Sequence, residues 1–371
     1  MKKETILIIY NAAHHVLLFK SELIESLKKN GYSVVVLASK DIYTEKLKNI
    51  VDEFHEINLN SSGLNPISDT LLIINILNLI KKINPICILN FTIKPVIYGT
   101  FAGKILGIPV INTITGLGTA FMSSGLTNKI VKTLYRLVLK FSHLVFFQNP
   151  DDRNFFIKLK IINKSNVKLI SGSGVDLEKF KLNKEINSDI IKILFVGRII
   201  ADKGIYELIE AARIIKNKYP NVSFSLMGML GVNNRTSISK TEIDNWVSDG
   251  LIEYIPFQED IRPILSDSNL VVLPSYREGT PKTLIEAASM SKPLVATNVP
   301  GCREVVVDGL NGFLCKVKNP ISLANSIKKY IEMNNDSKVR MGLMSRKIAE
   351  EKFDIIKVNN TYIEEINNLS K

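Results

Sequence analysis

Two glutamates in the second half of the chain, Glu278 and Glu286, are separated by seven residues and flank a predicted helix start. The apolar run Leu270–Leu273 predicts a strand that ends just before them. Thr280 is predicted as the N-cap of the helix and Pro281 as its first residue, where the missing N–H of proline costs nothing. The free N–H groups at that helix end would attract an anion. The two carboxylates could also accept hydrogen bonds from two parts of one polyhydroxylated ligand.

A purely structural interpretation of the same residues is also open. Lys282 and Glu286 stand at i,i+4 spacing on the predicted helix, which is typical of an exposed surface ion pair. Glu286 is nevertheless flanked by Ile285, Ala287 and Ala288, and these apolar neighbours favour its partial burial.

Two cations, Arg198 and Lys203, follow another predicted strand that ends at Val196. Gly197 precedes the arginine and Gly204 follows the lysine, so the backbone can approach a ligand closely at both places. Both cations should emerge at the carboxyl end of the strand, where ligands bind in open α/β sheets. A guanidinium fork and an ammonium point charge together suit a diphosphate. The alternative is that both are solvated charges at the start of a helix.

The succession of Gly-Arg, Lys-Gly and two glutamates separated by seven residues resembles the signature of the retaining glycosyltransferases of family 4, which have the two-domain GT-B fold. The resemblance implies that Arg198 and Lys203 act in catalysis on the diphosphate of a UDP-sugar. It assigns Glu278, also catalytic, to the hydroxyls of the transferred sugar and Glu286 to the ribose. The backbone of three further residues is assigned to the diphosphate: Gly279, Thr280 and Pro281.

The resemblance implies three more donor-binding positions. Gly197 lies beside Arg198, and Gly228 ends a predicted strand where the family contacts the donor, although a glycine there is more often only a turn residue. The backbone that reads the nucleotide base in the family corresponds to the run around Pro256, which has no N–H, so Ile255 or Phe257 is expected to make that contact.

The first half of the chain is expected to bind the acceptor. Many relatives have a Gly-Gly loop after the first strand, and here His14 and His15 stand there, either as ligands of the acceptor or with one of them only capping a helix. Gly116 and Gly118 form a glycine loop after a later strand. This loop, residues 93–99 and residues 300–304 resemble bacterial enzymes that extend undecaprenyl-diphosphate-linked sugars for capsule, O-antigen or N-glycan assembly. That resemblance implies a lipid-diphosphate-linked saccharide as acceptor.

A basic stripe recurs at helical spacing over Lys129, Lys132, Arg136 and Lys140, with apolar residues on the remaining faces. Such a helix suits the surface of an anionic membrane. A core helix with one solvated face has the same pattern, so both interpretations stay open.

The elements that would position these residues alternate between apolar strands and amphipathic helices from the start, which predicts doubly wound parallel sheets. A length of 371 residues suits two domains. We expect the α/β class in its GT-B form: a Rossmann-like acceptor domain over residues 1–182, a Rossmann-like nucleotide-sugar domain over 183–354, and a final helix at 355–371 that crosses back to the first domain. An interdomain cleft would hold the substrates.

Charge and composition agree with an anionic partner. The formal net charge is +12 with a pI of about 9.3, although a general excess of lysine raises the pI without any dedicated patch. The 3 cysteines are scattered without metal-ligand spacing, and no apolar run is long enough for a signal peptide or a spanning helix. We therefore expect a cytoplasmic protein, peripheral on the inner face of a bacterial membrane. No metal motif is evident, because Asp151 and Asp152 open a helix where acids are ordinary.

The predicted function is transfer of a hexose, with an N-acetylhexosamine favoured, from a UDP-sugar to an undecaprenyl-diphosphate-linked sugar, with retention and without a metal or other cofactor. The alternative enzyme is a UDP-GlcNAc 2-epimerase of the same architecture, which needs no acceptor. The alternative without catalysis is a basic protein that binds lipid or nucleic acid. We expect no nucleic-acid partner, because the sequence shows no helix-turn-helix, zinc finger or RNA-binding aromatic stripe.

Overall fold

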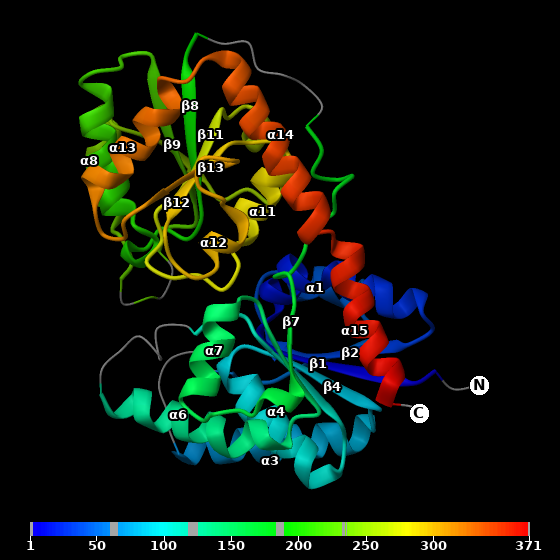
Figure 1. The fold of residues 1–371 in the computed structure, drawn as a ribbon. Helices are drawn as coiled ribbons and strands as arrows, with labels where there is room; N and C mark the ends of the chain where they lie inside the picture. The colour runs from blue at the N-terminus through cyan, green and yellow to red at the C-terminus, as the bar shows by residue number, and fades with distance from the viewer. Residues whose placement is uncertain are drawn as a thin grey trace. The chain divides into compact units, whose positions relative to one another are not determined.

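A computed structural model describes residues 3–59, 66–117, 125–182, 189–231, 234 and 236–369 (Figure 1). The chain divides into two compact units, residues 1–173 with 356–371 and residues 174–355. Each unit is a parallel sheet with helices on both faces.

The first unit contains a seven-stranded parallel sheet with the strand order β3-β2-β1-β4-β5-β6-β7. Apolar runs form the central strands, and side chains on both of their faces are buried, as a doubly covered sheet requires. The strands are β1 (Thr5–Ala12), β2 (Ser33–Ser39), β3 (Glu53–Glu56), β4 (Cys87–Phe91), β5 (Val110–Ile114), β6 (Leu144–Phe147) and β7 (Val167–Leu169).

Two apolar clusters cover the two faces of this sheet. One cluster joins the sheet to α3, α4, α6 and α7, and the other joins it to α1, α2 and α15. The helical elements are α1 (Ala13–Lys29), α2 (Thr44–Lys48), α3 (Pro66–Ile83), α4 (Ile93–Leu106), α6 (Leu126–Val138), η1 (Leu139–Phe141), α7 (Pro150–Lys158), η2 (Lys164–Asn166) and α15 (Ile355–Leu369).

The last helix, α15, packs on the first unit although the chain reaches it from the second. The Tyr362 ring is fully buried, and its hydroxyl lies 2.8 Å from Oγ1 of Thr113 in β5. The Asn359 side-chain amide donates 3.0 Å hydrogen bonds to Glu22 O and Ser26 Oγ of α1. The far end of the chain therefore completes the core of the first unit.

The second unit contains a six-stranded parallel sheet with the order β10-β9-β8-β11-β12-β13. Its strands are β8 (Ile191–Val196), β9 (Val222–Gly228), β10 (Glu253–Pro256), β11 (Leu270–Leu273), β12 (Leu294–Thr297) and β13 (Gly312–Cys315). Its helical elements are η3 (Ala201–Lys203), α8 (Ile205–Lys216), α9 (Lys240–Ser248), α10 (Arg262–Ser266), α11 (Lys282–Ser289), α12 (Cys302–Val305), α13 (Pro320–Ile331) and α14 (Asn335–Lys352).

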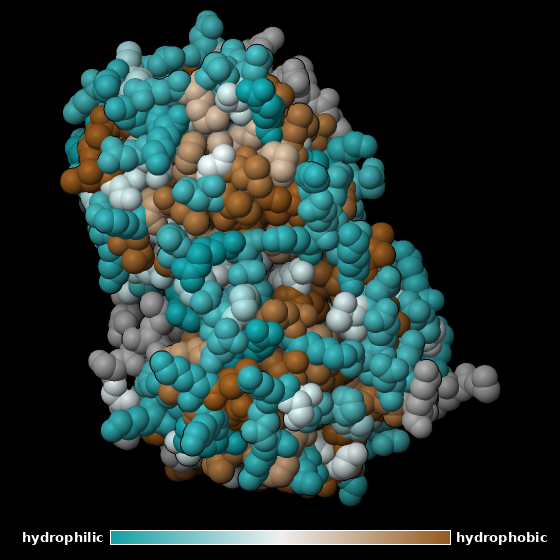
Figure 2. All heavy atoms as spheres, in the orientation of Figure 1, coloured by the Kyte–Doolittle hydropathy of each residue, from teal (hydrophilic) through white to brown (hydrophobic). Residues whose placement is uncertain are grey.

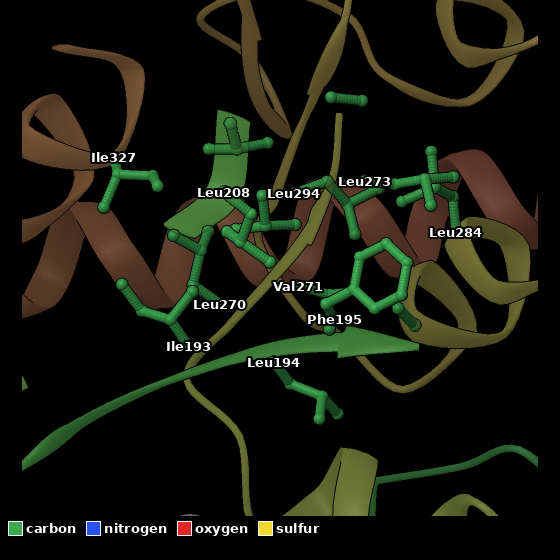
Figure 3. Close-up of a cluster of buried hydrophobic side chains, with 14 of the residues drawn as sticks. Ile193, Leu194, Phe195, Leu208, Leu270, Val271, Leu273, Leu284, Leu294 and Ile327 are labelled. Atoms are coloured by element: carbon green, nitrogen blue, oxygen red, sulfur yellow. The ribbon is translucent and has the colours of Figure 1, made fainter. Parts of the chain in front are cut away.

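The core of the second unit shows why the central residues of β8 are apolar. Ile193 and Phe195 stand on one side of the strand and Leu194 on the other, as the two-residue period of a strand requires (Figure 3). All three are at most 2% exposed, so both faces of the strand are buried under helices.

The predicted fold class, two doubly wound parallel sheets, is confirmed. Two short strands at sheet edges, β3 and β13, were missed: each has four residues, and β3 (Glu-Phe-His-Glu) has a single apolar residue. The final helix expected at 355–371 is α15, which begins at Ile355. None of the described helices is both long and apolar enough to cross a membrane.

Candidate active site

The cations and glutamates predicted from the sequence lie at the topological switch point of the second sheet. Strands β8 and β11 are neighbours in register, with Leu270 opposite Ile193 and Val271 opposite Leu194. From this pair, successive strands are added on one side as β9 and β10 and on the other as β12 and β13. Open α/β sheets bind ligands in the crevice at the carboxyl ends of the two strands where the order reverses in this way.

Lys203 and Glu278, which are 75 residues apart in sequence, meet directly at this point. The Lys203 ammonium forms a short ion pair with Oε1 of Glu278. The two side chains are only 18% and 12% exposed, so water screens the pair weakly. A backbone hydrogen bond of 2.9 Å from Tyr276 N–H to Asp202 O joins the same two loops.

Close backbone contacts that only glycine permits hold the loops of the site together. A Cβ on Gly204, whose φ is +74°, would lie 2.1 Å from the carbonyl oxygen of Pro274. A Cβ on Gly228 would lie 1.8 Å from the carbonyl oxygen of Gly197. The glycines predicted at positions 197 and 228 therefore touch each other, and each lies at the end of its strand.

A third glycine, Gly301, supports the glutamate loop from the β12 side. Its φ is +82°, and a Cβ there would lie 2.2 Å from Gly279 O and 2.8 Å from Glu278 O. Gly301 lies in the segment 300–304 that resembles the capsule-type enzymes, but the sequence did not indicate that it contacts the Glu278 loop. Its neighbour Cys302 is fully buried, and burial, followed by the Glu278 carboxylate, raises the pKa of its thiol.

The predicted start of the helix after Glu278 is wrong by one residue. α11 begins at Lys282, and Pro281 is its N-cap, with an extended ψ of 116° rather than the first helical position. The Pro281 carbonyl accepts the first helical hydrogen bonds, from Leu284 N–H at 3.1 Å and Ile285 N–H at 3.3 Å. Thr280, predicted as the N-cap, precedes this turn and is buried. The first helical N–H groups therefore belong to Lys282 and Thr283.

Glu286 is buried at 8% exposure, as its apolar neighbours suggested. Lys282 Nζ lies 3.8 Å from Glu286 Oε1, so the i,i+4 pair exists, but its side chains are only 21% and 10% exposed. The pair is therefore a partly buried feature of the site rather than the exposed surface pair that was the alternative.

Arg198 differs from Lys203 because it is exposed, and its guanidinium has no hydrogen-bond or ion-pair partner among the described residues. It follows Gly197 at the carboxyl end of β8. Ile255 lies in β10, paired in register with Met227 of β9, and the hydroxyl of the adjacent Tyr254 donates a 2.9 Å hydrogen bond to Gly228 O. Gly228 and Ile255 thus lie in the adjacent strands β9 and β10, and Gly197 directly follows β8, the next strand of the sheet.

His14 and His15 lie in the first turn of α1, which begins at Ala13 directly after β1. His14 Nδ1 is 2.7 Å from Oδ2 of Asp41, which also accepts the His14 N–H at 2.9 Å. His15 Nδ1 is 3.1 Å from Oδ1 of Asn11.

Asp41 is a residue that sequence reasoning missed, since nothing in its local pattern marks it. Burial by itself raises the pKa of its carboxyl, but hydrogen bonds from His14 and Tyr43 outweigh this and leave the pKa below its usual value. Gly116 follows β5 with a φ of +124°. Gly118, the other glycine predicted on the acceptor side, lies outside the described residues.

The predicted membrane stripe lies on α6 and the following turn. Lys129, Arg136 and Lys140 are exposed and Lys132 is half-buried. Arg136 donates hydrogen bonds of 2.9 Å and 3.3 Å to the carbonyls of Leu159 and Lys160, so it also caps α7.

The surface around this stripe carries apolar as well as basic side chains. Ile130, Leu137 and Phe141 are 37%, 50% and 39% exposed. The visible face of the first unit mixes apolar and hydrophilic side chains (Figure 2). Membrane binding stays a prediction.

Among the residues described, no cluster of three His, Cys, Asp or Glu side chains could hold a metal ion.

Two family models match the chain. The model described as "Glycosyl transferases group 1" matches residues 176–347, and the one described as "Glycosyl transferase 4-like" matches residues 6–149. The first model spans the candidate active site, and the second spans most of the first unit.

Curated relatives match over most of their length. The chain is 28% identical, over 88% of both chains, to the N,N'-diacetylbacillosaminyl-diphospho-undecaprenol alpha-1,3-N-acetylgalactosaminyltransferase of Campylobacter jejuni. It is 25% identical, over 98% of this chain and 99% of the relative, to the capsular polysaccharide biosynthesis glycosyltransferase CapM of Staphylococcus aureus. An Escherichia coli UDP-Gal:alpha-D-GlcNAc-diphosphoundecaprenol alpha-1,3-galactosyltransferase is 27% identical over 81% of each chain.

Solved structures share the fold over the whole chain. A glycosyltransferase of Rickettsia africae superposes with a TM-score of 0.80 at 20% identity, covering 100% of both chains. Anabaena HepE in complex with UDP-glucose also gives a TM-score of 0.80 at 20% identity, covering 98% of this chain and 99% of that one. The chain therefore has the fold of these proteins.

Proposed function

The chain belongs to the group 1 glycosyltransferases, and on this premise we propose that it moves a hexose from a UDP-sugar to a saccharide linked to undecaprenyl diphosphate, with retention at the anomeric carbon. An N-acetylhexosamine is the hexose we favour, because the Campylobacter relative is an N-acetylgalactosaminyltransferase. The observation that supports this most strongly is the contact of Lys203 with Glu278 after β8 and β11, together with the exposed Arg198 after β8, which has no side-chain partner among the described residues.

The donor would lie at the carboxyl ends of β8 and β11. An ammonium has three donors, and Glu278 occupies one of them on Lys203, which leaves the others for the donor diphosphate. Lys203 would then bridge the carboxylate that binds the sugar and the phosphate that leaves. Arg198 and the first N–H groups of α11 would complete the cradle.

Catalysis in this arrangement is mainly electrostatic. Negative charge grows on the leaving diphosphate as its bond to the sugar breaks, and Arg198, Lys203 and the start of α11 are preorganised to stabilise that charge. Glu286 would hold the ribose and the backbone at Ile255 the base, so the anomeric carbon is oriented as well as activated. We propose attack from the face of the leaving group, with the departing phosphate as base, because no side chain of the site is placed as an obvious nucleophile.

The acceptor side belongs to the first unit. The curated relatives named above include enzymes whose acceptors are linked to undecaprenyl diphosphate. We propose that His14, His15, Gly116 and Gly118 contact such an acceptor. We also propose that the basic residues of α6 hold the protein on the anionic inner surface of the bacterial membrane that contains it.

The test is a transfer assay that pairs a panel of UDP-sugars with short polyprenyl-diphosphate saccharides. We expect a product heavier by one hexose or N-acetylhexosamine, with the donor's anomeric configuration retained by NMR and full activity in excess EDTA. Incubation with UDP-GlcNAc alone separates the epimerase alternative, which would release N-acetylmannosamine or its UDP form without an acceptor. Inverted product, or epimerisation in place of transfer, would contradict the proposal.

A further inference from the structure

The first sheet has its own switch point, between β1 and β4, and polar residues that the proposed donor site does not use follow both strands. The two strands are neighbours, with Ile9 opposite Asn90, and strand order runs outward from them in both directions. His14 follows β1. Thr92 and Lys94 follow β4. This is the counterpart, within the first unit, of the place where Lys203 and Glu278 meet in the second.

Thr92 is held in an unfavourable conformation with an unused hydroxyl. Its φ of 68° and ψ of 168° fall in a region that almost only glycine occupies, which costs on the order of 1–3 kcal/mol. Its Oγ1 is buried and has no hydrogen-bond partner in the described part of the chain, and it does not cap α4 although Thr92 is the N-cap residue. A strained residue with an unsatisfied buried donor is typical of a functional site.

Lys94 and Asp69 form the charged part of the cluster. Lys94 Nζ lies 3.2 Å from Oδ1 of Asp69, and the two side chains are 15% and 14% exposed. A hydrogen bond between Asp69 and the buried Tyr98 hydroxyl helps to hold the carboxylate. Asp69 is the only partner of Lys94 among the described residues, so the nearly buried ammonium keeps two donors for another molecule.

Thr92 and Lys94 follow β4, and Asp69 pairs with Lys94; these three residues are named here the β4 cluster. We propose that the β4 cluster binds hydroxyls of the acceptor's terminal sugar. A sugar hydroxyl is both donor and acceptor, and the cluster offers an ammonium donor, a carboxylate acceptor and a hydroxyl that can be either. The charges of Lys94 and Asp69 cancel, which suits a neutral ligand. A phosphate would instead meet the carboxylate of Asp69, so the acceptor's diphosphate binds elsewhere.

The inference deepens the proposed function and rests on it. The competing explanation is an ion pair that only ties α3 to α4. That explanation accounts for Lys94 and Asp69, but it leaves the strain of Thr92 and its unpartnered hydroxyl without a reason. The two explanations predict different kinetics for variants that fold normally.

The decisive variant is Thr92→Val, which keeps the branched shape and removes only the hydroxyl. Because that hydroxyl has no partner among the residues that the structure describes, its removal should leave the thermal midpoint unchanged or raise it. With GlcNAc-diphosphate on a short polyprenol as the acceptor, we expect the KM for the acceptor to rise about tenfold, the effect of one lost hydrogen bond, while the KM for the UDP-sugar stays constant. Thr92→Ser should restore the wild-type KM.

Lys94→Met should lower kcat/KM for the acceptor about 10- to 100-fold, as expected for a charge-assisted hydrogen bond. Lys81→Met is the matched control, since Lys81 is exposed on α3 and lies outside the cluster. Acceptors that lack single hydroxyls provide a second readout. An acceptor without the hydroxyl that the β4 cluster binds should have a lower kcat/KM than the complete acceptor with the wild type, but not with Lys94→Met.

Two failures are distinguishable in this experiment. If the wild type transfers sugar but Thr92→Val and Lys94→Met keep its acceptor KM, the β4 cluster is only structural and the inference is overturned. If the wild type binds UDP-sugar but transfers to none of the polyprenyl-diphosphate acceptors, the proposed function fails, and the inference with it.

Discussion

Removal of the Lys203 ammonium should lower both the stability of the protein and kcat, and a second substitution at Glu278 should restore the stability alone. Lys203→Met leaves the Glu278 carboxylate without its cation in a place where it is only 12% exposed. Breaking a fully buried pair costs about 3–5 kcal/mol, and the remaining water access here reduces our expectation to about 2–3 kcal/mol. The double variant Lys203→Met/Glu278→Gln has no unpaired charge and should recover most of that loss.

Catalysis should not recover with stability. The electrostatic stabilisation of a leaving group by one preorganised donor is worth about 10²–10³ in kcat, and neither variant supplies it. The assays are thermal unfolding and steady-state transfer from the UDP-sugar, both run on the wild type and the two variants. We expect the midpoint to fall in the single variant and rise again in the double one, while kcat stays low in both.

A matched control is available in the same unit. Lys192 Nζ lies 2.7 Å from Asp267 Oδ1, but these side chains are 35% and 63% exposed. Lys192→Met should therefore cost at most about 1 kcal/mol and leave kcat unchanged. If Lys203→Met behaved like this control, or if the double variant regained activity, the proposed role of Lys203 would be refuted.

Three further predictions concern groups in other environments. Arg198→Ala should lower kcat by about 10²–10³ without a change in thermal midpoint, because the guanidinium has no partner among the described residues; a wild-type kcat would contradict the site. Replacing Lys129, Lys132 and Lys140 with glutamine should weaken binding to anionic vesicles in flotation at low salt, and flotation of the wild type that is insensitive to salt would refute an electrostatic surface. Burial lowers the pKa of Lys292 from 10.5 to about 8, so between these pH values the unfolded chain binds more protons than the folded one. Stability, measured as the urea midpoint, should therefore rise as the pH increases from about 8 to 10.5, and Lys292→Met should abolish that rise.

Several features could be predicted from the sequence because they depend on short stretches of chain. The bounds of β11 coincide with the predicted range Leu270–Leu273, since a continuous apolar run is a local signal. The Gly-Arg, Lys-Gly and paired-glutamate motifs are local in the same sense. Their chemistry follows from residue type, so a diphosphate and a polyhydroxylated ligand could be inferred before any strand order was known.

Other features depended on contacts that no local pattern specifies. The short strands β3 and β13 each pair with one neighbouring strand, β2 and β12, and that pairing is not encoded in their own four residues. The helix after Glu278 begins at Lys282 because Pro281 adopts an extended ψ in its loop, which propensity alone did not indicate.

The sequence by itself determined which residue types are available to bind ligands, and it determined the alternation of strands and helices in which they stand. Only the tertiary structure decided which of them meet. Lys203 reaches Glu278 across 75 residues because β8 and β11 are neighbours, and Asp41 reaches His14 across 27 residues. The physical reason is that apolar patterning dictates which faces are buried, whereas the order of strands in a sheet follows from packing the whole chain.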